Sequence, residues 1–185
     1  VQQKGSLVSE NYLRFDFSHF SKLSEVDKSK VENFVNQKIV EKIELVEKRD
    51  SSLKECLDQG AIALFGEKYG DRVRSIQFGS SLELCGGTHV QNTIDLRTFT
   101  VISESAISTG VRRIEALCGN SALEFLNKRS KTINEINSIL ATTENQVDAI
   151  NKLKNNNTQT LKKLEKINED LINYYIKDIR ENLIF

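Results

Sequence analysis

The chain has 185 residues, 38% of them hydrophobic, which is enough for a hydrophobic core. Its 26 Lys and Arg residues balance 26 Asp and Glu residues, so no overall positive field draws it to nucleic acids or membranes, and any RNA contact is expected to be local. No apolar run approaches the roughly 20 residues of a membrane-spanning helix, and we expect no membrane partner.

The cysteines and the start of the chain bear on where the protein works. Its three cysteines, at positions 56, 85 and 118, are widely separated, unlike the even, closely spaced sets of disulfide-rich secreted domains. A reducing compartment is therefore expected, and we expect the cytoplasm. The chain begins at Val1 without an initiator Met or a signal peptide, which we interpret as a segment of a longer protein.

Three elements are predicted before residue 70. Residues 12–20, YLRFDFSHF, alternate apolar and polar side chains, which predicts a half-buried strand. Ser24 suits the N-cap of an amphipathic helix over about residues 25–47, where apolar residues recur at three- and four-residue steps. A shorter helix is predicted over residues 52–66, with Gly66 or Gly70 as its stop.

From Asp71 the apolar period changes to two. Four strands or strand–turn units are predicted in succession: VRSIQF, LELCGGTHV, RTFTVISESAI and STGVRRIEALCG. Helices followed by consecutive strands predict an α+β fold, an antiparallel sheet with packed helices, over residues 1–119.

Beyond Gly119 the chain is predicted to be helical. A narrow apolar stripe repeats every seven residues, and a second stripe follows an expected interruption, KNNNTQT, at residues 154–160. The two helices can fold back as a hairpin, or one nearly continuous helix can pair with another chain as a coiled coil; the sequence leaves both open. Residues 120–185 carry 10 basic and 9 acidic side chains, so self-association is favoured over RNA binding. The stripes comprise Leu126, Ile133, Leu140 and Val147, then Leu161, Leu164, Leu171, Tyr175, Ile179 and Leu183.

Residues 83–90, ELCGGTHV, contain the main candidate for chemistry. Cys85 and His89 can bind one metal ion if Gly86 and Gly87 turn the chain between them. Zinc suits mixed sulfur and nitrogen ligands, but it takes four, and this motif offers two. The alternative is a chance pairing in a loop. The remaining candidates, His19, Cys56 and Cys118, are scattered singly, and we assign the two cysteines to packing.

A family resemblance changes this balance. The run ALFGEKYGDRVRSIQFGSSLELCGGTHV, with QKGSLV and LRFDFSH before it and VRRIEALCG after it, resembles the editing domain of alanyl-tRNA synthetase and of related free-standing editing proteins. Gly-Gly-Thr within the motif favours the alanyl over the threonyl branch. The resemblance implies an N-terminally incomplete editing domain over residues 1–119. Residues 120–185 resemble the helical linker that follows it in that family.

The resemblance also implies a metal and a reaction. In this family zinc is bound by an HxxxH pair and by a CxxxH pair; the second maps onto Cys85 and His89, and the first would lie shortly before Val1. The implied reaction is hydrolysis of serine or glycine misattached to the acceptor end of tRNA(Ala), with zinc activating water or anchoring the substrate. ATP and magnesium are expected only for a separate aminoacylation domain of the parent alanine–tRNA ligase. A non-catalytic assembly module with an empty half-site is the alternative.

Further site residues follow from the resemblance as hypotheses. Gly86, Gly87 and Thr88 would bring backbone N–H groups and a hydroxyl near the aminoacyl group. Gln3 would bind the hydroxyl of a misattached serine, unless it is simply exposed. Glu83 is expected on the same side of its strand as Cys85, where it would orient a ligand or water, unless it is an ordinary surface carboxylate.

Charged residues in two other motifs allow more than one role. Asp16 and His19 can form a pair behind the site, or His19 can be purely structural. Arg112 and Arg113 are adjacent in a strand and must point to opposite faces, so one is expected to pair with a carboxylate such as Glu115 and the other to meet tRNA phosphate. The family commonly has Thr-Gly and a further Gly where this chain has TIDLR at residues 93–97, which predicts a reshaped turn.

Overall fold

The computed structural model describes residues 1–63, 68–141 and 145–182. It divides into two compact units, Val1–Asn127 and Lys128–Phe185. The first contains two antiparallel sheets with helices, which confirms the predicted α+β class, and the second is helical.

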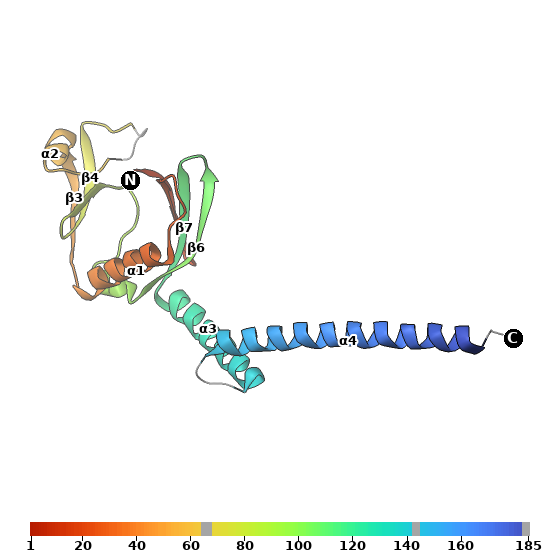
Figure 1. Cartoon of the computed structure of the whole chain (residues 1–185). Helices are drawn as coiled ribbons and strands as arrows, with labels where there is room; N and C mark the ends of the chain where they lie inside the picture. The colour runs from red at the N-terminus through yellow and green to blue at the C-terminus, as the bar shows by residue number, and fades with distance from the viewer. Residues whose placement is uncertain (64–67, 142–144, 183–185) are drawn as a thin grey trace. The chain divides into compact units, whose positions relative to one another are not determined.

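One sheet of the first unit has four strands in the order β1-β2-β7-β6 (Figure 1). The predicted strand at residues 12–20 is confirmed as β2, and the last two predicted strands form the long β6–β7 hairpin. Each strand is antiparallel to its neighbours, and β2 is an inner strand because it pairs with both β1 and β7. The bounds are β1 Gln3–Val8, β2 Leu13–Ser18, β6 Phe99–Ser108 and β7 Val111–Cys118.

A second sheet of three strands, in the order β3-β4-β5, carries the candidate motif at its end. Its strands are β3 (Leu45–Ser52), β4 (Arg72–Phe78) and β5 (Ser81–Leu84). Leu45, Val46 and Glu47 belong to β3, so the helix predicted to residue 47 is too long. Helix α1 (Glu25–Val40) ends before Lys42, whose φ of 55° turns the chain toward the sheet.

The second predicted helix is also too long. Helix α2 (Leu53–Asp58) covers only part of the expected 52–66 span, because Gly60, with φ of 86°, turns the backbone out of the helix. Ile62 then makes a parallel bridge to Glu83 and so extends the second sheet. Residues 64–66 of the predicted helix, with Gly66 among them, lie outside the described residues.

Two small hydrophobic cores stabilise the first unit. Helix α1 starts at Ser24, which forms the predicted N-cap and a capping box with Asp27, and packs its apolar side on the four-stranded sheet. Helix α2 covers the three-stranded sheet through buried Cys56, and Cys118 packs against the first core, as predicted for both thiols. The first core consists of Phe17, Ile39, Phe99, Ile114 and Ala116, and the second of Cys56, Ala61, Val73 and Leu84.

The C-terminal residues form helices α3 (Gly119–Leu140) and α4 (Gln146–Asn182). The interruption predicted at residues 154–160 is wrong: α4 runs through it, and the hydroxyls of Thr158 and Thr160 donate to carbonyls four residues back. The described helices are instead separated earlier in the chain: α3 ends at Leu140, before Ala141 at φ of 50°, and α4 begins at Gln146. Residues 150–182 are all exposed, so the stripe of α4 is not buried within the described chain. Leu183 lies outside the described residues, and none of the described helices meets the length and hydropathy needed to cross a membrane.

Candidate functional site

The CxxxH motif forms a loop directly after β5. Strand β5 ends at Leu84, whose buried side chain fixes the start of the loop in the second core. A Cβ built on Gly87 would lie 3.6 Å from the sulfur of Cys85 and 4.0 Å from Cε1 of His89. Both side chains therefore lie close to the same point of the backbone.

The chemical state of these two groups suits a metal. Cys85 is a free, half-buried thiol. Nδ1 of His89 is buried and has no hydrogen-bond partner among the residues that the structure describes, although buried polar atoms are normally paired. Sulfur and imidazole nitrogen are ligands that zinc prefers. Cys85 and His89 thus offer one sulfur and one nitrogen donor, and the described residues contain no cluster of three or more His, Cys, Asp or Glu residues able to hold a metal ion.

Arg74, on β4, holds this loop from the neighbouring strand. Its Nη1 donates to the carbonyl of Cys85 at 2.9 Å and to the carbonyl of Gly87 at 2.6 Å. Its Nε donates to a carboxylate oxygen of Glu47 at 2.7 Å. The bonds from Arg74, and then from Arg49, hold the pKa of Glu47 below its ordinary value of 4.5, so the carboxylate stays ionised at neutral pH.

Gln3 and Glu83 line a common cavity of about 520 Å³. Gln3 comes from β1 of the four-stranded sheet, and Glu83 comes from β5 of the three-stranded sheet. Gln3 donates to the hydroxyl of Ser6 at 3.1 Å, and Glu83 is exposed. The remaining lining comes from Val1, Gln2, Lys4, Phe15, Ile62 and Ala63.

Cys85 and Gly86 line a different cavity, of about 230 Å³, together with Arg74. Strand β5 ends before Cys85, so the strand alternation that was expected to bring Glu83 and Cys85 to one side does not extend to Cys85. Gly86, Gly87 and Thr88 are exposed, and their backbone is accessible to a ligand.

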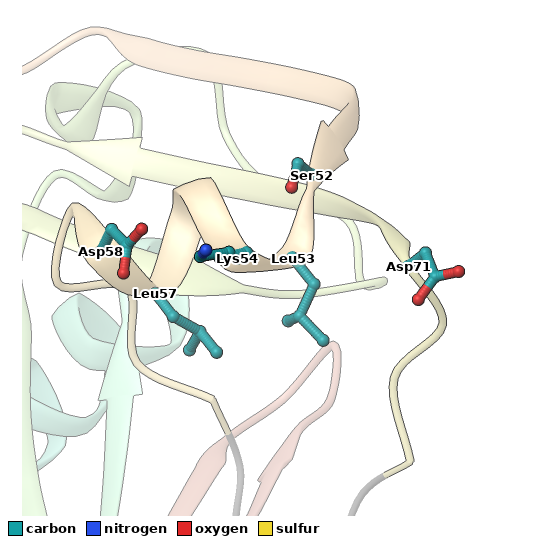
Figure 2. Close-up of a pocket in the computed structure, with 6 residues that line it drawn as sticks. All are labelled: Ser52, Leu53, Lys54, Leu57, Asp58 and Asp71. Carbon is teal, nitrogen blue, oxygen red and sulfur yellow. The ribbon is translucent and has the colours of Figure 1, made fainter.

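A third cavity, of about 500 Å³, lies beside α2 and contains none of the predicted site residues. Figure 2 shows Leu53 and Leu57 projecting from the same side of α2, with Asp71 at the edge of the cavity. Its lining has no cysteine or histidine.

Both arginines of β7 are paired with carboxylates, which corrects the predicted partners. Arg112 makes a bidentate pair with Glu104 at 2.6 and 2.7 Å. Arg113 makes one with Asp16, the residue directly opposite it on β2, also at 2.6 and 2.7 Å. Glu115 instead accepts from Ser103.

His19 and the turn at residues 93–97 have structural roles here. His19 contacts the hydroxyl of Ser21 at 3.2 Å, and Asp16 is bound to Arg113, so the two do not form the suggested pair. A short 3₁₀ helix, Thr93–Leu96, is followed by Arg97 at φ of 60°, a conformation that favours glycine. The turn therefore forms without the glycines that the family commonly has.

The residues that sequence reasoning missed are Arg74 and Glu47. Arg74 alternates with the apolar residues of VRSIQF, and the sequence pattern gives it no specific role. Glu47 lies in the segment that the sequence predicts to be helical but that forms β3. Alternation alone could have indicated that Arg74 lies on the polar face of its strand, but its loop contacts depend on pairing between distant segments.

Known proteins are similar to this chain over a range that includes the loop. Residues 73–115 match the family model described as the threonyl and alanyl tRNA synthetase second additional domain. Alanine–tRNA ligase from Christiangramia forsetii is 50% identical over 170 residues, which cover 92% of this chain and 20% of that protein. The enzyme from Flavobacterium psychrophilum is 45% identical over 93% of this chain and 19% of its own length.

A relative of lower identity gives a similar result. Alanine–tRNA ligase from a strain of Prochlorococcus marinus is 42% identical over 184 residues, which cover 98% of this chain and 21% of that protein. The chain thus spans about a fifth of the length of these relatives, and the similarity includes the helical residues as well as the sheets. The resemblance inferred from the motifs is confirmed: over more than nine-tenths of its length, this chain is similar to a segment of alanine–tRNA ligases.

Proposed function

We propose that this chain supplies half of the zinc ligands of an editing site that hydrolyses Ser-tRNA(Ala) and Gly-tRNA(Ala), within a longer protein that ligates alanine to tRNA(Ala). The observation that carries the proposal is that Cys85 and His89 flank one point beside Gly87, with Nδ1 of His89 buried and unbonded among the described residues. The proposal also places the protein in the cytoplasm, which its three free cysteines favour.

Hydrolytic editing is needed because binding alone discriminates poorly between amino acids of similar size. A pocket for alanine discriminates weakly against serine, which adds one hydroxyl, and against glycine, which is smaller, so a second hydrolytic site supplies the missing selectivity. Water adds to the ester carbonyl, the bond to the ribose oxygen breaks, and free amino acid and tRNA leave. A bound zinc ion would supply either an activated water or an anchor for the aminoacyl group.

The predicted site residues of this chain have different roles in the proposed reaction. Cys85 and His89 hold the metal, and the glycines between them leave backbone N–H groups open to the substrate oxygen. Thr88 adds an exposed hydroxyl. Gln3 and Glu83 share one cavity, which supports a role for Gln3 in binding the serine hydroxyl and for Glu83 in orienting water or substrate.

The part of the chain that the structure describes contains no group of three or more possible ligands, and we propose that the family's HxxxH pair, preceding Val1, supplies the other two zinc ligands. The relatives are about five times longer than this chain, which leaves room for that segment and for a domain that uses ATP and magnesium. The chain's partner in this proposal is the acceptor end of tRNA(Ala), and its contacts are local because the net charge is zero.

Hydrolysis of charged tRNA tests the proposal. A longer form of the protein that includes the segment preceding Val1 is expected to bind zinc and to deacylate Ser-tRNA(Ala) about 100-fold faster than buffer does. Ala-tRNA(Ala) is the matched substrate control and should be largely spared. If the longer form binds no zinc and leaves Ser-tRNA(Ala) untouched, the editing proposal is wrong.

One observation favours a second role, self-association through α4. Six aliphatic residues along this helix are between 48% and 57% exposed, although a monomer gains nothing from leaving such a stripe in water. A second copy of the helix would cover it as a coiled coil. The six residues are Ile150, Leu153, Leu161, Leu164, Leu171 and Ile179.

Sedimentation equilibrium measures this association. The unmodified chain is expected to sediment at twice its monomer mass of 21.0 kDa. Leu164→Glu should return it to the monomer, because a charge would then be buried in the seam. Lys163→Glu, one residue away and off the stripe, should leave the dimer intact. A monomeric unmodified chain, or equal effects of the two variants, would rule out pairing along this stripe.

A further inference from the structure

Two carbonyl groups of the loop after β5 accept hydrogen bonds from the same side chain. Nη1 of Arg74 contacts the carbonyl oxygens of Cys85 and Gly87, which lie on either side of Gly86. The backbone N–H of Cys85 in turn donates to the carbonyl of Arg74 at 3.3 Å. The first residue of the loop is thus bound to both the backbone and the side chain of Arg74.

Glu47 fixes the guanidinium that makes these contacts. The side chains of Arg74 and Glu47 are 24% and 21% exposed, so the pair is largely shielded from water. Nε of Arg74 is used by Glu47 and Nη1 by the loop, and the planar guanidinium therefore couples the carboxylate rigidly to the two carbonyls. A lysine, with a single nitrogen, offers no such two-sided geometry.

A β-bulge lies opposite Arg74. Lys48 pairs with Ser75 and Ser51 pairs with Val73, so two residues of β3, Arg49 and Asp50, face the single residue Arg74 on β4. Bulges bend a strand and redirect the side chains around it, and they are common beside functional sites. Here the bulge directly follows the part of β3 that supplies Glu47.

The loop needs such a fixed point because of its glycines. Gly86 and Gly87 have wide backbone freedom, and a loop containing both samples many conformations unless something outside it restrains the backbone. We propose that Arg74, held by Glu47, is a positioning residue that fixes the Gly86–Gly87 turn and thereby keeps the Cys85 sulfur and the His89 imidazole beside the same point. The inference rests on the proposed function only for the identity of the ligand, zinc.

The same strand provides a matched control. Arg72 lies two residues before Arg74 on β4 and also forms an ion pair with an acidic residue of β3, Asp50. The side chains of that pair are 59% and 74% exposed, and the three guanidinium hydrogen bonds of Arg72 all go to Asp50 instead of the loop. Arg72→Gln therefore removes the same charge from the same strand and leaves the loop carbonyls bound.

Hydrogen exchange of the purified chain, followed residue by residue, tests the inference without metal or tRNA. Arg74→Gln is expected to raise the exchange rate of the Cys85 amide, the loop amide that donates to the carbonyl of Arg74, about 10-fold or more relative to unmodified protein, with the β4 and β5 amides changed less than about threefold. Arg72→Gln should leave the loop rates within about threefold. Glu47→Gln, a milder change that keeps Arg74, should raise them by an intermediate factor, and it serves as the test if Arg74→Gln does not fold.

Metal affinity gives a second readout. In the longer form of the protein, cobalt(II) used alone as a probe is expected to bind about 10-fold or more weakly to Arg74→Gln than to Arg72→Gln. Unchanged loop exchange in Arg74→Gln, an equal rise in Arg72→Gln, or a rise spread uniformly over β4 and β5 would overturn the positioning role. An unmodified protein that binds no metal would contradict the proposed function and leave the exchange result to decide the role of Arg74.

Discussion

Replacing Glu104 by Gln is expected to lower the free energy of unfolding by about 3 kcal/mol. The Glu104 side chain is only 1% exposed, and it accepts two hydrogen bonds from Arg112 and one from the backbone N–H of Leu23. Gln keeps the shape but removes the charge, so Arg112 is left with an uncompensated charge in a poorly solvated place. Urea denaturation followed by circular dichroism measures the change.

Asp50→Asn is the control, because Asp50 also pairs with an arginine but lies at the surface with its side chain 74% exposed. Surface ion pairs contribute little, and no measurable change is expected. A similar loss of stability in both variants would mean that burial of the Glu104–Arg112 pair is not what makes it important.

The same pair sets a pH dependence. Its hydrogen bonds with Arg112 hold the pKa of Glu104 below the ordinary value of 4.5 in the folded protein. A carboxylate with a lowered folded pKa stabilises the protein fully above its unfolded pKa and loses that contribution as pH falls toward the folded pKa. The stability gap between unmodified protein and Glu104→Gln should therefore be constant from neutral pH down to about 5 and shrink below it. A gap that stays constant at low pH would contradict the ionised pair.

Replacing Cys85 by Ala is expected to weaken zinc binding by about 100-fold or more in a form of the protein that contains all four ligands, because the variant loses one of them outright. Zinc content after dialysis, and competition with a chromophoric chelator, measure the loss. Little change in global stability should accompany it in the metal-free protein, since Cys85 is only half-buried in its loop.

Cys118→Ala is the matched thiol control. Cys118 packs against the core of the four-stranded sheet, and burial raises the pKa of its thiol, which keeps it protonated and unsuited to bind metal at neutral pH. This variant should lose about 1 kcal/mol of stability through poorer packing and keep its zinc. Equal loss of zinc in both variants would mean that Cys85 is not the ligand.

The helix boundaries show where local patterns stop being informative. The apolar steps through Ile39, Ile43 and Val46 suit a helix, yet the residues from Leu45 pair with β4, a segment about thirty positions away in the chain. Pairing at that distance overrides local periodicity. In α4 a helix continues where the local sequence predicted an interruption. Asn and Thr at residues 154–160 each cost only about half a kcal/mol of helix propensity, which is too little to end so long a helix.

The ion pairs also depend on contacts between distant segments, which local sequence patterns do not predict. Alternation along β7 correctly predicts that Arg112 and Arg113 point to opposite faces, because it needs only one strand. Their partners depend on strand register, which places Asp16 directly opposite Arg113 and brings Glu104 to Arg112. A carboxylate nearby in sequence, Glu115, was the wrong choice.

The candidate site also contains residues that the sequence can predict and residues that it cannot. Cys85, Gly87 and His89 lie within five residues, so their proximity can be predicted from the motif alone. Arg74 and Glu47 come from two other strands and meet the loop through a specific register and a bulge. The ligands of such a site are therefore visible in the sequence, and the residues that hold them in place are visible only in the fold.

The most direct test of the central claim is hydrolysis of Ser-tRNA(Ala) by Cys85→Ala and Cys118→Ala, compared side by side in the longer form of the protein at saturating zinc. We expect Cys85→Ala to lose about 100-fold or more of the deacylation rate and Cys118→Ala to retain it within about threefold. Equal rates in the two variants, with zinc still bound to both, would contradict a role for the Cys85–His89 loop in editing.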